Sequence, residues 1–128
     1  MLTPKKLVGE VVSGFGLATE SLSPLYETIK ERSGLPVVEG TLNVQLREPY
    51  IVIPEIVLDA REHRHHETIM LQRCFALDRP GLILRTHTQA MGSSHALDII
   101  EIMSVENLRS TRGLADGDRV EIYVEKFV

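Results

Sequence analysis

The stretch Thr41-Leu42-Asn43-Val44-Gln45-Leu46 alternates polar and apolar side chains at every step, and the fold class follows from that pattern. Successive residues of an extended strand point to opposite faces, so a period of two predicts a strand with one buried and one polar face. β-type runs continue from here to the end of the chain. They predict five further strands, at residues 50–58, 68–77, 82–88, 96–103 and 119–127.

Upstream of this stretch the chain predicts one more strand and one helix. Residues 5–12 form an apolar-rich run that ends at Ser13-Gly14-Phe15-Gly16, where the glycines predict a tight loop. Ser23 and Pro24 are typical of a helix N-cap and first helical position, and Gly34 marks the end of about three turns. This is the one main helix that the sequence predicts.

Turn signals separate the strands. Residues 78–81 (Asp-Arg-Pro-Gly) predict a turn, and residues 113–118 lead into the last strand, where apolar and polar side chains alternate. Many short strands with one helix indicate a mainly β fold: a small, closed or nearly closed barrel of six or seven strands.

Composition limits the class of protein. A chain of 128 residues is the size of a single domain, expected over residues 1–128, and 43% hydrophobic with 25% charged residues is typical of a globular protein. No apolar run reaches the roughly 18 residues of a membrane span, so no membrane partner is expected. The lone Cys74 lies in an apolar run and predicts core filling in a reducing compartment, which favours the cytoplasm.

The charge balance argues against nucleic acid as a partner. The net charge is −4, from 14 Lys and Arg against 18 Asp and Glu. Binding to a phosphate backbone relies on a positive field that this composition does not provide. The absence of Trp and an aromatic content of 5% also argue against a platform for stacking single-stranded bases.

Thr41 and Asn43 are candidate Mg²⁺ ligands. They lie two residues apart on a predicted strand, so their oxygens share one face while Leu42 turns to the core. Mg²⁺ takes few protein ligands and leaves its other positions to water and phosphate oxygens. An ordinary polar strand face explains the same spacing, so both interpretations remain open.

Two other segments could carry chemistry. The glycines of residues 13–18 could aim backbone N–H groups at a phosphate, or could serve only as a turn. His63, His65 and His66 could bind Zn²⁺ or Ni²⁺, but neighbouring arginines favour a solvated hairpin tip. The chain has neither the GxxxxGK[ST] run nor the protein-kinase motif set.

Taken together, these signals resemble the archaeal CTP-dependent riboflavin kinases. The similarity extends over most of the chain and is loosest between residues 47 and 84. Its pieces, in chain order, are GEVVSGFG at residues 9–16, EGTLNV at 39–44, RTH at 85–87, IIEI at 99–102, NLR at 107–109 and LADGD at 114–118.

The resemblance implies a cradle-loop barrel that transfers the γ-phosphoryl group of CTP to the 5′-hydroxyl of riboflavin, giving FMN and CDP. It implies Mg²⁺ on Thr41 and Asn43, and flavin contacts from Thr86 and Glu101. It also implies two nucleotide-binding segments, made of Gly14, Phe15, Gly16, Leu17, Ala18 and Thr19, and of Glu106, Asn107, Leu108 and Arg109. No residue is indicated as a general base, and no pattern predicts an oligomeric state.

Two alternatives are weighed against the kinase. Ala18 stands where the family commonly has a small or flexible glycine, Thr88 stands where it often has tyrosine, and the segment 89–96 is long. These departures allow a non-catalytic module that binds a flavin or nucleotide on the same barrel. A barrel-type DNA-binding regulator is suggested by structural kinship alone, and the charge balance opposes it.

Overall fold

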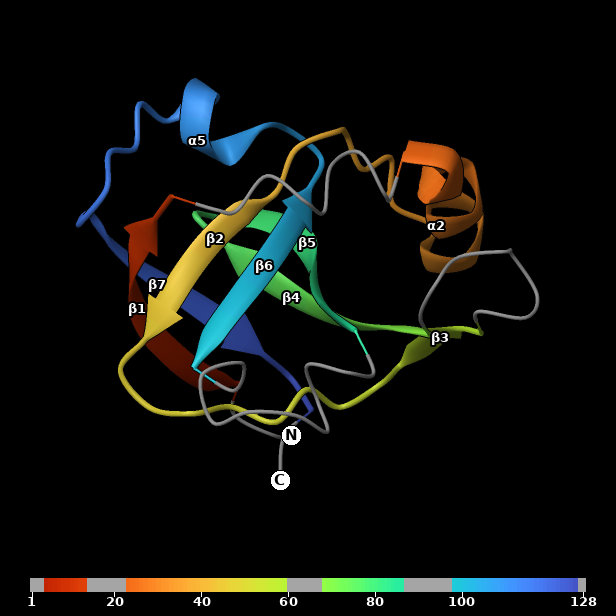
Figure 1. Cartoon of the computed structure of the whole chain (residues 1–128), viewed down its shortest axis with the longest axis horizontal. Helices are drawn as coiled ribbons and strands as arrows, with labels where there is room; N and C mark the ends of the chain where they lie inside the picture. The colour runs from red at the N-terminus through yellow and green to blue at the C-terminus, as the bar shows by residue number, and fades with distance from the viewer. Residues whose placement is uncertain (1–3, 14–22, 60–67, 87–97, 127–128) are drawn as a thin grey trace.

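The structure is a computed structural model that describes residues 4–13, 23–59, 68–86 and 98–126. Seven antiparallel strands dominate it (Figure 1). They are β1 (Lys5–Val12), β2 (Leu42–Leu46), β3 (Ile56–Leu58), β4 (Ile69–Ala76), β5 (Arg79–Thr86), β6 (Ile99–Ser104) and β7 (Arg119–Val124). The described helical elements are η1 (Ser23–Leu25), α2 (Tyr26–Ser33) and α5 (Leu108–Thr111).

Six of the strands close into a barrel. The sheet order is β3-β4-β5-β6-β2-β1-β7, and an additional pairing of β4 with β7 joins the two sides of the sheet. Phe75 pairs with Tyr123 and Ala76 with Ile122 at this closure. Strand β3 remains outside the closed ring, paired to β4 alone. The mainly β barrel with one main helix is therefore confirmed.

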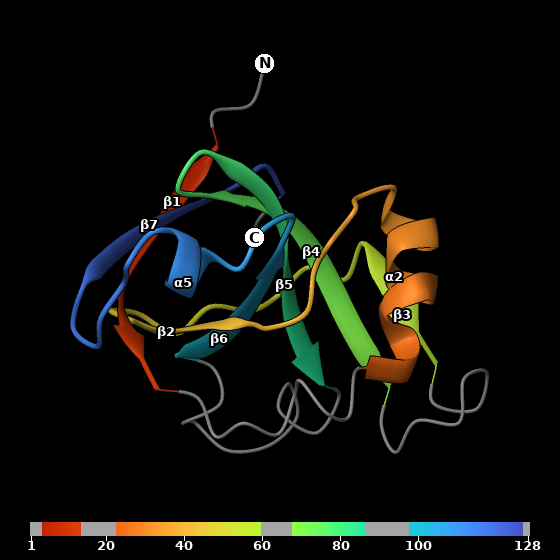
Figure 2. The same cartoon turned by 90° about the horizontal axis from the view of Figure 1, so that it is seen from above.

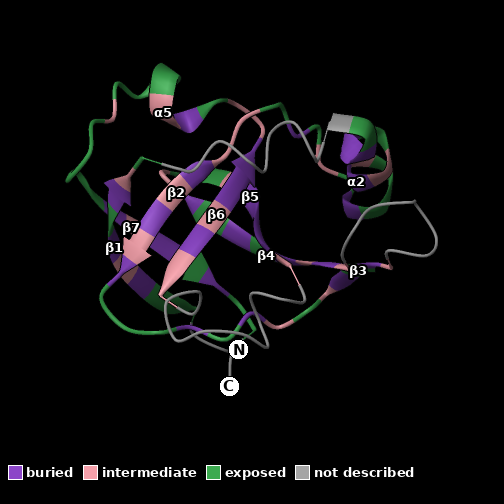
Figure 3. Ribbon diagram, in the orientation of Figure 1, coloured by how far each residue is buried: buried purple, intermediate pink, exposed green. Residues whose placement is uncertain are grey.

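Apolar side chains form two cores, one on each side of the barrel wall. The interior core contains alternate residues of every barrel strand, among them Val44, Ile83 and Ile122. Cys74 fills part of it, and burial raises the pKa of its thiol to about 12, as expected for a core thiol. The second core lies outside the wall, where α2 packs beside β3 and β4 (Figures 2 and 3).

The long strand predicted at residues 50–58 is wrong in its first two thirds. Only Ile56–Leu58 forms a strand. Pro54 has no N–H to give to a ladder, and the N–H of Ile53 donates instead to the Gln72 side chain at 3.0 Å. Tyr50 and Val52 are nevertheless buried. The apolar pattern of this segment therefore indicated buried side chains correctly, although the segment does not pair as a strand.

The turn between β4 and β5 lies earlier than predicted. Leu77 and Asp78 occupy it, with φ angles of 53° and 63°, while Pro80 already pairs with Phe75 in the ladder. Two residues of positive φ in succession match the turn type that fits the twist of a hairpin. The proline and glycine that suggested a turn at residues 78–81 instead begin the strand.

The start of the predicted helix also differs. Residues Ser23–Leu25 form a 3₁₀ turn, and α2 begins at Tyr26 with no side-chain cap. The predicted end is confirmed, because Gly34 closes the helix in a left-handed conformation with φ 74° and donates to the carbonyl of Lys30.

We expect Ile83→Ala to destabilise the protein by about 3 kcal/mol, because Ile83 is fully buried in the barrel interior and truncation leaves a cavity. Urea denaturation measures the change. Val57→Ala is the control, because Val57 is 41% exposed on β3 and its truncation should cost less than about 0.5 kcal/mol. Equal losses in the two variants would contradict the assignment of the interior core.

Candidate functional site

Polar residues predicted from distant parts of the sequence meet at one end of the barrel. In the sheet, Val12 at the end of β1 pairs with Asn43 at the start of β2, and Asn43 pairs with Glu101 of β6. Helix α5 lies over the same end (Figure 1). We call this end the α5 rim, formed by residues 12–13, residues 40–43, Glu101 and residues 106–109.

Thr41 and Asn43 both lie at the α5 rim. Both side chains are half-buried, whereas Leu42 between them is buried in the interior core. Directly opposite residues of an antiparallel pair share a face, so Asn43 and Glu101 project to the same outer side. Burial raises the pKa of the Glu101 carboxyl above its ordinary value of 4.5.

Thr86 shares this outer face with Glu101. Glu101 pairs with Leu84, and Thr86 follows Leu84 by two residues on β5, which makes Thr86 and Glu101 diagonal neighbours. Arg85 lies between Leu84 and Thr86 on β5, so its side chain points to the opposite face of the sheet. It is buried there and donates hydrogen bonds to the carbonyls of Tyr50 and Ile99. The sheet thus brings the predicted flavin pair to one surface.

Gly40 is enclosed between two helices. Its φ is +97°, and its N–H donates to the Tyr26 phenol oxygen at 3.2 Å. A Cβ at this position would lie 2.7 Å from Asn107 Nδ2, so the Asn107 side chain would have to shift, and the positive φ itself favours glycine. Burial raises the pKa of the Tyr26 phenol, and the nearby Glu39 and Glu101 carboxylates raise it further.

Tyr26 is a site residue that the sequence analysis missed. It lies within the predicted helix, which was inferred from Ser23, Pro24 and Gly34, and it belongs to the buried face of α2. The hydrogen bond to a residue 14 positions away depends on tertiary packing, which periodicity does not report.

The segment 106–109 serves several purposes. Leu108 is buried in the interior core and anchors α5, while Asn107 caps α5 by accepting from the Ser110 N–H. Arg109 Nη2 donates to Asp116 Oδ1 at 2.8 Å, and Ser13 Oγ donates to Asp116 Oδ2 at 2.7 Å. Arg109 therefore lies close to the end of β1.

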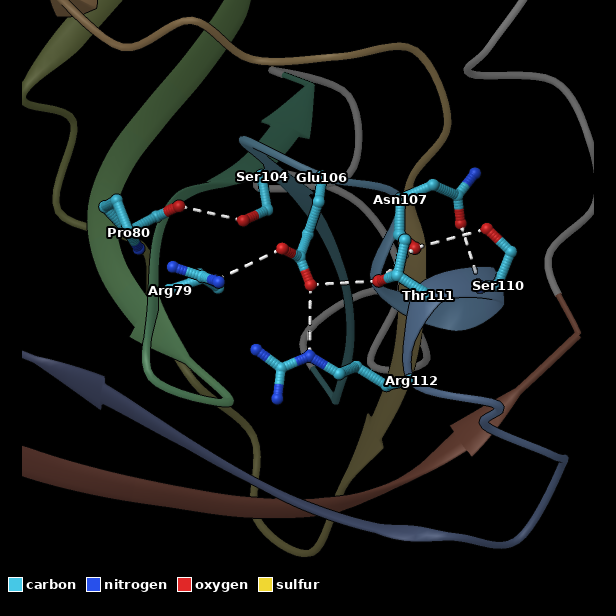
Figure 4. Close-up of polar contacts among 8 residues, drawn as sticks. All are labelled: Arg79, Pro80, Ser104, Glu106, Asn107, Ser110, Thr111 and Arg112. Atoms are coloured by element: carbon cyan, nitrogen blue, oxygen red, sulfur yellow. Dashed lines mark hydrogen bonds and ion pairs between the residues drawn. The ribbon is translucent and has the colours of Figure 1, made fainter.

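Glu106 is occupied by partners within the protein. Arg79 Nε lies 3.1 Å from one carboxylate oxygen, and Arg112 Nε and the Thr111 hydroxyl donate to the other at 3.0 and 2.9 Å (Figure 4). Chiefly through the Arg112 hydrogen bond, and then that of Thr111, these contacts hold the pKa of Glu106 below its ordinary value. In Figure 4 the Asn107 side chain lies on the side of Ser110, apart from Glu106.

Other predicted residues lie outside the described part of the chain. They are Gly14, Phe15, Gly16, Leu17, Ala18, Thr19, His63, His65 and His66. Within the described residues, no group of three or more His, Cys, Asp or Glu side chains is arranged to hold a metal ion. None of the described helices has the length and hydropathy that crossing a bilayer needs.

The fold and the polar rim place the chain among small antiparallel barrels with a candidate site at one end. A family model, CTP-dep_RFKase, described as "Domain of unknown function DUF120", matches residues 11–124, and the chain belongs to this family.

The chain is also similar to curated proteins that are named riboflavin kinase. The protein named riboflavin kinase from Pyrobaculum islandicum is 32% identical over 133 residues, covering 93% of this chain and 60% of that protein. The riboflavin kinase of Methanocella arvoryzae is also 32% identical, over 91% of this chain and 56% of its own length. That of Staphylothermus marinus is 26% identical, over 94% of this chain and 92% of its own length. The chain thus spans about three fifths of the first two relatives.

We expect Glu106→Gln to lower the melting temperature at neutral pH and to have no effect in strong acid. A carboxyl whose folded pKa is depressed contributes stability above its unfolded pKa, here about 4.5, and loses it as the pH falls through the lower folded value. Melting curves from pH 7 to pH 3 measure the difference between the two proteins.

The control is Glu31→Gln, which removes an exposed carboxylate from α2. A gap between wild type and Glu106→Gln that stayed constant down to pH 3 would contradict the role of ionised Glu106 in holding α5.

Proposed function

We propose that the protein is a riboflavin kinase that transfers the γ-phosphoryl group of CTP to the 5′-hydroxyl of riboflavin, with Mg²⁺, and releases FMN and CDP. Family membership and the names of the curated relatives support the phosphorylation of riboflavin. The observation that carries the proposal is the α5 rim, where candidate metal, flavin and nucleotide residues from four separate segments come together.

The nucleotide half of the proposed site is the side of the rim formed by Ser13, Asn107 and Arg109. Arg109 contributes the positive charge there, and a guanidinium offers several N–H donors to phosphate oxygens. Residues 14–19, which follow Ser13 in sequence, are proposed to add backbone N–H groups. Phosphoryl transfer depends mainly on positioning and charge neutralisation, which suits a site without an assigned general base.

The residues at the rim fit a hard divalent cation. Thr41 and Asn43 offer neutral oxygens on one face, and the half-buried Glu101 carboxylate lies opposite Asn43. Burying a negative charge is costly, and a cation beside it offsets that cost. Mg²⁺, when bound, would neutralise charge on the phosphate oxygens.

The flavin half of the proposed site is the outer face of β5 and β6. Thr86 and Glu101 offer a hydroxyl and a carboxylate there, next to the apolar side chains of Leu84 and Met103. Leu84 and Met103 are buried in the core under α2, so they hold the backbone of β5 and β6 on which this polar pair is carried. Glu101 would accept hydrogen bonds from hydroxyl groups and so orient the acceptor.

The direct test is to incubate the protein with riboflavin, CTP and Mg²⁺ and to measure FMN by chromatography. We expect FMN with CTP and less product when ATP replaces it. Parallel calorimetry with riboflavin and with CDP distinguishes a non-catalytic binding module, which would bind without turnover. Absence of FMN with every nucleoside triphosphate would refute the proposed activity.

The metal assignment is tested by the double variant Thr41→Val and Asn43→Leu, which replaces both oxygens by apolar groups. We expect Mg²⁺-dependent CDP affinity to fall by at least about tenfold, because the ligands of the cation are lost. Calorimetry with and without Mg²⁺ measures it.

Gln45→Leu is the matched control, because Gln45 lies two residues farther along the same half-buried face of β2. Its Mg²⁺-dependent affinity should stay within about twofold of wild type. Undiminished binding in the double variant would show that the metal ligands lie elsewhere.

A further inference from the structure

The turn that follows α5 is fastened to the end of β1 by backbone hydrogen bonds. The Val11 N–H donates to the carbonyl of Asp118 at 2.9 Å, and the Gly117 N–H donates to the carbonyl of Val11 at 2.8 Å. Asp118 also closes the turn on itself, because its carboxylate accepts from the Ala115 N–H at 2.8 Å. These contacts hold the backbone around Asp116 without using the Asp116 side chain.

The Asp116 carboxylate joins two segments that are distant in the sequence. One oxygen accepts from the Ser13 hydroxyl at 2.7 Å, across 103 residues, and the other accepts from Arg109 Nη2 at 2.8 Å. The Ser13 hydrogen bond, followed by that of Arg109, lowers the pKa of the Asp116 carboxyl. Asp116 is therefore ionised at neutral pH, as an anchor for a guanidinium requires.

We propose that Asp116 is a positioning residue for the nucleotide, an inference that rests on the function proposed above. It holds the Arg109 guanidinium beside Ser13 at the end of β1, on the side of the α5 rim where the polyphosphate of the nucleotide is proposed to bind. One N–H of Arg109 is used by Asp116, and the Arg109 side chain is 39% exposed, so other donors remain accessible to phosphate oxygens.

The physical gain lies in preorganisation. A free arginine side chain has many rotamers, and fixing it before the ligand arrives reduces the entropy lost on binding. The Asp116 side chain is 55% exposed, and ion pairs at such exposure contribute little to stability. Removing the carboxylate should therefore affect nucleotide affinity far more than folding.

The test compares Asp116→Ala with Glu121→Ala in calorimetric titrations with CDP and Mg²⁺. Glu121 is the charge-matched control, because its carboxylate lies on β7 and pairs with Lys6 and Arg119 instead of with residues of the rim. We expect about tenfold weaker CDP binding for Asp116→Ala and less than twofold change for Glu121→Ala. Binding by Asp116→Ala within twofold of wild type, or tighter, would overturn the inference.

Double variants show whether Asp116 acts through its two partners. The loss caused by Asp116→Ala should be smaller in an Arg109→Ala background and in a Ser13→Ala background than in the wild type. Full additivity in both backgrounds overturns the inference. If Asp116→Ala does not fold, Ser13→Ala alone removes one of the two contacts and must weaken CDP binding.

Steady-state kinetics separate positioning from a general structural defect. Asp116→Ala should raise KM for CTP about tenfold while KM for riboflavin stays within twofold, and its melting temperature should match that of Glu121→Ala. Equal increases in both KM values contradict the inference. If the wild-type protein binds no CDP and makes no FMN, both the proposed function and this inference are refuted. If the wild type is active and Asp116→Ala behaves like it, only this inference is refuted.

Discussion

The pairing of β4 with β7 is the constraint on which the rest of the structure depends. It consists of Phe75 with Tyr123 and Ala76 with Ile122, and it turns a seven-stranded sheet into a closed ring with one strand left over. Closure gives every barrel strand an inside and an outside. The interior becomes one apolar core, and antiparallel registers then decide which polar residues share the outer surface.

Strand β2 shows how one short segment meets two demands. Its apolar residues fill the barrel, while its polar residues remain half-buried on the outer face. The registers of β2 with β1 and β6 then place Val12, Asn43 and Glu101 in one row across three strands. A site assembled from such a row is held by ladder hydrogen bonds, which position side chains more firmly than a loop does.

Features with a local cause could be predicted from the sequence, and features with a tertiary cause could not. An apolar-rich run gave the bounds of β1, the β-type runs gave β2 and β4 to within one residue at each end, and Gly34 correctly ended α2. The apolar pattern also predicted a strand that runs through Pro54, and this prediction was wrong. Buried apolar residues that do not pair in a sheet can follow the same pattern as those of a strand. The pairing of Asn43 with Glu101 and the Ser13–Asp116 contact depend on register and chain closure, which a single sequence does not encode in any short window.

Tyr26 gives the molecule a natural fluorescent reporter close to the α5 rim. The chain has no Trp, three Tyr and three Phe, so its ultraviolet emission comes mainly from the phenols. Tyr26 touches the α5 rim through Gly40, Tyr50 is bonded to Gln72 elsewhere, and Tyr123 stands 41% exposed on β7. Tyr26 also lies close enough to Glu101 to feel its charge, so a light-absorbing ligand bound on the outer face of β5 and β6 would quench Tyr26 emission, and its binding could be followed without attaching a label.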